Sequence, residues 1–129
     1  MKVSTFLTIK AFVSIIFGVL FVLVPAGAMA IFDVSLDAVG VFMVRYYGVG
    51  MLGIGLICAF YRNRDRNTLA DIFLALFIAD TIGFIIALTG QLSGLVNLLH
   101  WVPVLFWLFF AAGMGYFRFT KDVSSSAST

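Results

Sequence analysis

The chain has 129 residues, of which 63% are hydrophobic and only 11% are charged, and its formal net charge is +2. This composition excludes an ordinary soluble domain. It also excludes a nucleic-acid-binding surface, because the basic residues stand at the ends of apolar runs and not together on one solvated face. We therefore expect an integral membrane protein that is surrounded by the lipid bilayer and has no nucleic-acid partner.

The first apolar run permits two interpretations. Lys2 and Lys10 precede most of it and Ala28-Met29-Ala30 follows it, an arrangement that resembles a secretory signal with a small-residue cleavage site. However, the run extends over residues 5–25, and about 20 residues is the length of a stable membrane-spanning helix. We favour a first transmembrane helix over a cleaved signal, and we expect Lys10 to extend its ammonium toward the lipid headgroups.

Residues 26–40 form the longest predicted connection, and Asp37 near its end is placed to cap the next helix. A second span is predicted over residues 41–61. Offsets of three, seven, ten and fourteen residues return to the same face of a helix, and the residues at these offsets are Arg45, Gly48, Leu52, Gly55 and Ala59. We interpret this face as a packing face in a bundle interior, with room for a flat ligand beside the backbone as the alternative.

A polar turn over residues 62–68 leads into the third span, which is predicted over residues 69–89. Thr68 is the expected cap of this helix, with Asp71 in a capping-box position. Asp80 is near the middle of the span, where a carboxylate costs about 2.5–3.5 kcal/mol on the insertion scale. The many Leu, Ile and Phe residues offset that cost, so the span still inserts, with Asp80 facing protein or water and not lipid.

The third span also carries small residues four positions apart, namely Ala75, Ala79, Gly83 and Ala87. Small residues at this spacing let helices approach each other closely in lipid. Asp80 borders the series. We favour a packing face with a paired acid beside it, and a proton or ion site is the alternative.

The fourth span is predicted over residues 98–117, with Asn97 as its cap and a bend near Pro103. The Ser-rich segment 120–129 is expected to be flexible, because it has little apolar surface to bury. Seven of the eight basic residues fall on one side of the four-helix arrangement: Lys2, Lys10, Arg62, Arg64, Arg66, Arg118 and Lys121. The positive-inside rule then places both termini in the cytoplasm.

These spans predict an all-α fold in which residues 1–119 form one domain, a four-transmembrane-helix bundle. Polar residues of similar depth predict a buried cluster of Arg45, Asp80, His100 and Tyr46. We expect an ion pair between Arg45 and Asp80, because an unpaired charge inside a membrane is expensive. His100 is the only histidine and is interpreted as a hydrogen-bonded residue of the interfacial belt, with an axial ligand to a haem or chlorin as the alternative.

The sequence contains no nucleophile–base pair, carboxylate dyad or zinc-binding spacing, and we expect no catalytic activity, no metal and no cofactor. Cys58 is the only cysteine, which excludes an intrachain disulfide and a cysteine metal cluster.

Three sequence patterns carry a resemblance to a known class of proteins. They are Leu36-Asp37-Ala38-x-Gly40, Arg45-x-x-Gly48-x-x-x-Leu52-Gly53-x-Gly55-Leu56 and Gly115-Tyr116-Phe117. The chain resembles small four-helix bacterial membrane proteins of unknown function and, more distantly, DoxX-like proteins. The resemblance implies a four-helix bundle in a bacterial inner membrane. Some DoxX-like proteins are associated with quinone or redox chemistry, but this chain has no cysteine pair for it, so no activity is carried over.

We therefore predict a multi-pass membrane protein that acts by association, as an accessory subunit of a larger complex or as a homo-oligomer. The alternative is binding or transport of a quinone-like or lipid-like molecule, or of a proton, through a cavity lined by Arg45, Asp80 and His100.

Overall fold

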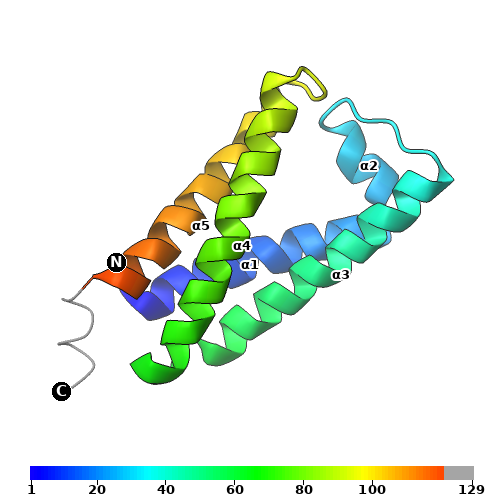
Figure 1. Cartoon of the computed structure of the whole chain (residues 1–129). Coiled ribbons are helices and arrows are strands. Elements are labelled where there is room, and N and C mark those ends of the chain that lie inside the picture. The colour runs from blue at the N-terminus through cyan, green and yellow to red at the C-terminus, as the bar shows by residue number, and fades with distance from the viewer. Residues whose placement is uncertain (121–129) are drawn as a thin grey trace. The chain divides into compact units, whose positions relative to one another are not determined.

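The structure is a computed structural model that describes residues 1–120 of the chain. Within that range its regular secondary structure is all helical (Figure 1), with α1 at Val3–Leu23, α2 at Pro25–Ala30, α3 at Ala38–Tyr61, α4 at Arg66–Leu92, the 3₁₀ turn η1 at Leu98–His100 and α5 at Trp101–Phe119. Four stretches are long and apolar enough to cross a membrane: α1, α3, α4 and η1 together with α5. The all-α fold with four candidate spans is thus confirmed, and the predicted flexible segment lies outside the described residues except for Thr120.

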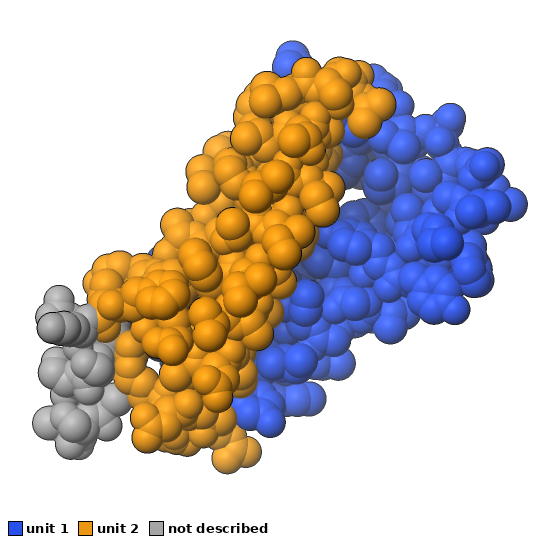
Figure 2. Space-filling view, in the orientation of Figure 1, with its two compact units in different colours: residues 1–62, 96–99 blue, residues 63–95, 100–129 orange. Residues whose placement is uncertain are grey.

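The contacts divide the chain into two compact units, which Figure 2 shows in different colours. Unit 1 comprises Met1–Arg62 and Val96–Leu99, and unit 2 comprises Asn63–Leu95 and His100–Thr129. Each unit contains one antiparallel pair of long helices, α1 with α3 and α4 with α5. The single bundle over residues 1–119 and the cytoplasmic termini stay predictions.

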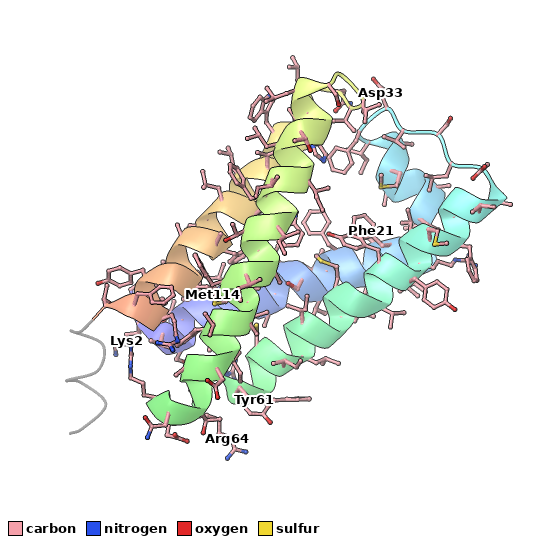
Figure 3. All side chains as sticks on the ribbon, viewed as in Figure 1. Lys2, Phe21, Asp33, Tyr61, Arg64 and Met114 are labelled. Carbon is pink, nitrogen blue, oxygen red and sulfur yellow. The ribbon has the colours of Figure 1, made fainter. Side chains whose placement is uncertain are left out.

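In unit 1, glycines allow the backbones of α1 and α3 to approach closely. A Cβ atom at Gly48 would stand 2.9 Å from the carbonyl oxygen of Gly18, and one at Gly18 would stand 2.9 Å from the carbonyl oxygen of Gly48. Two turns further along α3, a Cβ at Gly55 would stand 3.1 Å from the carbonyl oxygen of Ala11. The α1–α3 interface therefore has no room for side chains at these positions. Phe21, labelled in Figure 3, extends it by packing its ring against Tyr47, with 5.5 Å between the centroids.

In unit 2, aromatic rings cover the glycines that face the partner helix. The ring of Trp107 on α5 lies over Gly83, and the ring of Phe77 on α4 lies over Gly115. Phe73 and Phe117 stack with their centroids 5.9 Å apart. Further buried apolar side chains of these two helices are Leu69, Leu76, Val104, Phe110 and Met114. Met114 is labelled in Figure 3. This unit is therefore held by ring-over-glycine packing, whereas unit 1 is held by direct backbone approach.

The short helix α2 is absent from the prediction, which treated residues 26–40 as a connection. Pro25 occupies its first turn, where the missing N–H of proline costs no hydrogen bond. The helix ends where Asp33 adopts a positive φ of 60° and the backbone N–H of Val34 donates to the carbonyl of Met29. This is the Schellman geometry, in which aspartate takes a position that glycine usually fills.

The caps of α3 and α4 test two sequence predictions. Asp37 caps α3 as predicted, because its carboxylate accepts a 2.7 Å hydrogen bond from the backbone N–H of Gly40. The prediction for α4 is wrong. Asp65, and not Thr68, is the N-cap, and its carboxylate accepts from both the backbone N–H and the hydroxyl of Thr68. The helix therefore begins at Arg66, three residues before the apolar run.

The connection from α4 to α5 also differs from the prediction. Helix α4 ends at Leu92, and two residues later Gly94 has a φ of 74°, a left-handed conformation that glycine adopts without strain. Asn97 accepts from the backbone N–H of Leu99 at 3.0 Å and so caps the 3₁₀ turn η1, whereas the N-cap of α5 itself is His100, which makes no side-chain capping hydrogen bond. Pro103 lies in the first turn of α5, where helices tolerate proline, so it marks a helix start and not a mid-helix bend.

The cap at Asp65 gives a stability prediction with a defined pH dependence. The hydrogen bond from the Thr68 hydroxyl, and after it the one from the Thr68 backbone, hold the pKa of Asp65 below its ordinary value of 3.8. A carboxyl group whose pKa is lowered by folding stabilises the protein above its unfolded pKa, and that contribution is lost as the pH falls through the folded pKa. We expect Asp65→Ala to lower the thermal midpoint at neutral pH, measured by circular dichroism in detergent, and the difference from the wild type to shrink below pH 3.8.

Asp71→Ala is the matched control, because Asp71 is an exposed carboxylate in the second turn of the same helix. An equal loss in both variants would show that the general charge of this end, and not the cap, stabilises α4.

Candidate functional site

Asp80 is the most buried polar side chain of the candidate site, with only 1% of its surface exposed. It belongs to the buried side of α4, together with Phe73, Leu76 and Ala87. These residues recur at intervals of three, four and seven, which place them on one helix face. The expectation that Asp80 does not face lipid is consistent with this position.

Arg45 and Tyr46 lie on the surface of unit 1. Both side chains are exposed, and the ring of Tyr46 meets Phe42 edge-on with 4.8 Å between centroids. Gly48 and Gly55 face α1, whereas Arg45 at the margin of the same face does not become buried. Arg45 belongs to unit 1 and Asp80 to unit 2, and the ion pair between them stays a prediction.

His100 is half-buried in unit 2, and its ring Nδ1 is 3.2 Å from the side-chain oxygen of Gln91. The predicted hydrogen bond of His100 is therefore present, with a partner that the sequence did not indicate. Gln91 is eleven residues beyond Asp80 on α4, which corresponds to about 16 Å along the helix axis. Within unit 2, Asp80 and His100 thus occupy different depths and do not form one cluster.

Lys10 corrects another expectation. Its side chain is only 3% exposed, so it does not extend to the headgroups, and Ser14 one turn further is buried as well. The spacing of Lys10, Ser14 and Gly18 was a signal for this arrangement, because residues four apart share a helix face and Gly18 is a packing residue. The sequence analysis did not use this spacing, because it treated Lys10 as a cation at the end of the helix.

The predicted small packing residues have different environments. Gly48 and Gly55 lie against α1, Gly83 lies under Trp107, and Ala87 is buried. Ala59 is half-buried, whereas Ala75 and Ala79 are exposed. In α4 the buried positions are therefore mainly large residues, and the first half of the small-residue series remains on the surface.

Cys58 is completely buried on α3, where it packs as a small apolar side chain. No group of three or more His, Cys, Asp or Glu side chains within residues 1–120 could hold a metal ion. No protein-family model, curated protein or solved structure matches the chain.

Proposed function

We propose that the protein acts by association in a bacterial inner membrane, as a homo-oligomer or an accessory subunit, without catalytic activity of its own. The observation that supports this proposal is a pair of glycines on α3 that make no close packing contact with another helix within residues 1–120. A Cβ atom at Gly50 or Gly53 would meet nothing within 4 Å. These two glycines differ in this respect from Gly48 and Gly55, which lie against α1.

Glycine inside a helix costs about 1 kcal/mol relative to alanine. At Gly48 and Gly55 close packing offsets this cost, but at Gly50 and Gly53 no contact with the described residues does so. In lipid, small residues on an exposed helix face allow another helix to approach closely and gain van der Waals contacts. Contact with a second protein therefore accounts for the unused pair.

The surroundings of the two glycines suit such a contact. Tyr46, Gly50, Gly53, Ile57 and Phe60 follow one another at intervals of four, three, four and three residues, so they share one helix face. The three large residues of this group are 64%, 46% and 71% exposed, in chain order. We call this set the open face of α3. Its glycines leave the helix backbone accessible between large apolar side chains that can pack beside a partner helix.

Cysteine crosslinking in native membranes tests the proposal. In a Cys58→Ala background, we expect Gly50→Cys to form disulfide-linked homodimers, or a heavier adduct with another subunit, at several times the yield of Val49→Cys. Val49 is the matched control because it is exposed at the same depth and points about 100° away around the helix. Equal yields for the two variants would contradict association through the open face.

The second candidate function is the binding or transport of a quinone-like or lipid-like molecule, or of a proton, through Arg45, Asp80 and His100. The observation that favours it is the near-complete burial of Asp80 in a candidate membrane span, since ionisable residues at such positions often mark ion or substrate pathways. A pH-dependent flux in proteoliposomes that Asp80→Asn abolishes would favour this candidate over association.

A further inference from the structure

Two arginines occupy the end of unit 2 at which α4 begins and α5 finishes. Arg66 is the first residue of α4, and its Nη2 donates a 2.6 Å hydrogen bond to the backbone carbonyl of Phe117. That carbonyl is in the last turn of α5. The carbonyl groups of a last turn have no N–H partner within the helix and carry partial negative charge. The position of Arg66 is thus explained by its contact with the end of α5.

Arg118 follows Phe117 and has no such explanation. Its Nε atom is buried and has no hydrogen-bond partner among residues 1–120. The guanidinium carbon is 5.5 Å from the ring centroid of Phe119, a contact that attracts the cation but does not satisfy its N–H groups. A buried N–H donor without an acceptor is destabilising, so Arg118 is a position where an additional acceptor is expected.

The electrostatics of this end favour an anion as that acceptor. The charges of Arg66 and Arg118 repel each other, and neither guanidinium forms an ion pair with a carboxylate in the described part of the chain. Asp65, the acid next to Arg66, already accepts two hydrogen bonds from Thr68. Two neighbouring cations that have no counter-charge among residues 1–120 are stabilised by a ligand that accepts from both.

The position along the helices indicates the chemical class of the ligand. Arg66 and Arg118 lie at the ends of candidate membrane spans, together with exposed aromatic residues Tyr116 and Phe119. Aromatic and basic residues at the ends of spans mark the headgroup level of a membrane. Guanidinium groups bind phosphate through parallel N–H donors, and phosphate is the anion that is concentrated at this level.

We propose that Arg66 and Arg118 form a binding site for the phosphate of an anionic lipid headgroup. Arg118 supplies the outer N–H groups of its guanidinium to the site, and Arg66 supplies a second charge whose position is fixed by the carbonyl of Phe117. If the basic residues served only to orient the protein in the membrane, any basic residue at this end of unit 2 would serve equally well. A phosphate-binding site, in contrast, depends on these two side chains.

The test uses the full chain purified in detergent and native mass spectrometry with added phosphatidylglycerol or phosphatidylcholine. We expect one retained phosphatidylglycerol per chain, little retention of phosphatidylcholine, and about a tenfold or greater loss of phosphatidylglycerol affinity in Arg118→Gln. Arg62→Gln is the charge-matched control, because Arg62 is an exposed basic residue of the nearby turn. Equal losses in both variants, or equal retention of both lipids, would overturn the proposal.

Two further measurements keep the test decisive. Arg118→Lys preserves the charge but removes the planar pair of donors, and we expect it to bind more weakly than the wild type. Inorganic phosphate at the same concentration as the lipid should not displace phosphatidylglycerol. Displacement would show that the two arginines bind a free anion and that the assignment to a lipid is wrong. Arg118→Gln removes no hydrogen bond within the described residues, so its effect does not depend on loss of the Arg66–Phe117 contact.

Discussion

Replacement of Gly48 or Gly55 by alanine is expected to lower the free energy of unfolding by about 1–3 kcal/mol, as overpacking does in well-packed interiors. The new methyl group at position 48 would stand 2.9 Å from the Gly18 carbonyl oxygen and 2.9 Å from the Cβ of Phe21. At position 55 it would stand 3.1 Å from the backbone nitrogen of Ile15. Since backbone atoms cannot rotate away, α1 and α3 must move apart and lose contacts along their whole length.

The same helix provides the controls for this prediction. Gly50→Ala and Gly53→Ala add a methyl group where nothing lies within 4 Å, and a helix gains up to about 1 kcal/mol from such a change. Thermal unfolding of the four single variants, followed by circular dichroism in detergent, should therefore separate them into two pairs with opposite shifts. A common shift for all four would mean that intrinsic helix propensity, and not the close approach of α1, determines the stability of unit 1.

Loss of the charge at Asp80 is the second prediction with a large effect. Asp80→Asn keeps the shape of the side chain but removes the charge from a site that is 1% exposed. Breaking a buried ion pair by changing one partner typically costs about 3–5 kcal/mol, because the other charge is left uncompensated. We expect a loss of this size in the free energy of unfolding, together with a lower yield of folded protein. An unchanged yield and stability would contradict an ion pair at Asp80.

A double-mutant cycle tests whether Arg45 is the cation that couples to Asp80. The cycle combines Asp80→Asn with Arg45→Gln, the pair predicted from the sequence. A coupling energy above about 0.5 kcal/mol distinguishes a real interaction from additive effects. Thr81→Ser, next to Asp80 on α4, controls for nonspecific damage to this part of the helix.

The four spans, the Asp37 cap and the packing of Gly48 and Gly55 could be predicted because each depends on local information. Four apolar runs of sufficient length specify four helices wherever they lie in space, and an aspartate or asparagine before such a run accepts from the backbone that follows it. The seven-residue interval between Gly48 and Gly55 places both on one face. Their packing followed from that interval, since a face with small residues is where a second helix can approach.

Other features depend on hydrogen bonds or on neighbours that apolar periodicity does not encode. Helix α4 exceeds its apolar run at both ends because Asp65 caps it early and Gly94 ends it late. The partner of His100 is Gln91, a polar residue two positions beyond the predicted third span. Lys10 was predicted to be an interfacial cation because it lies near the start of the first apolar run. Its side chain is instead buried, and that burial depends on the elements packed around it.

The hydrogen bonds of Asn97 have a consequence for the order in which the parts of unit 1 fold during synthesis. Its side chain donates to the carbonyl of Ile31 at 2.8 Å, and its backbone N–H donates to the carbonyl of Phe32. Helices α1 and α3 can pair as soon as both have left the ribosome, since chains fold from the N-terminus during synthesis. The segment after α2, however, can form its hydrogen bonds with Asn97 only after α4 has also been synthesised. During translation, the α2–α3 connection is therefore the last part of unit 1 to become protected from proteases and from chaperone binding.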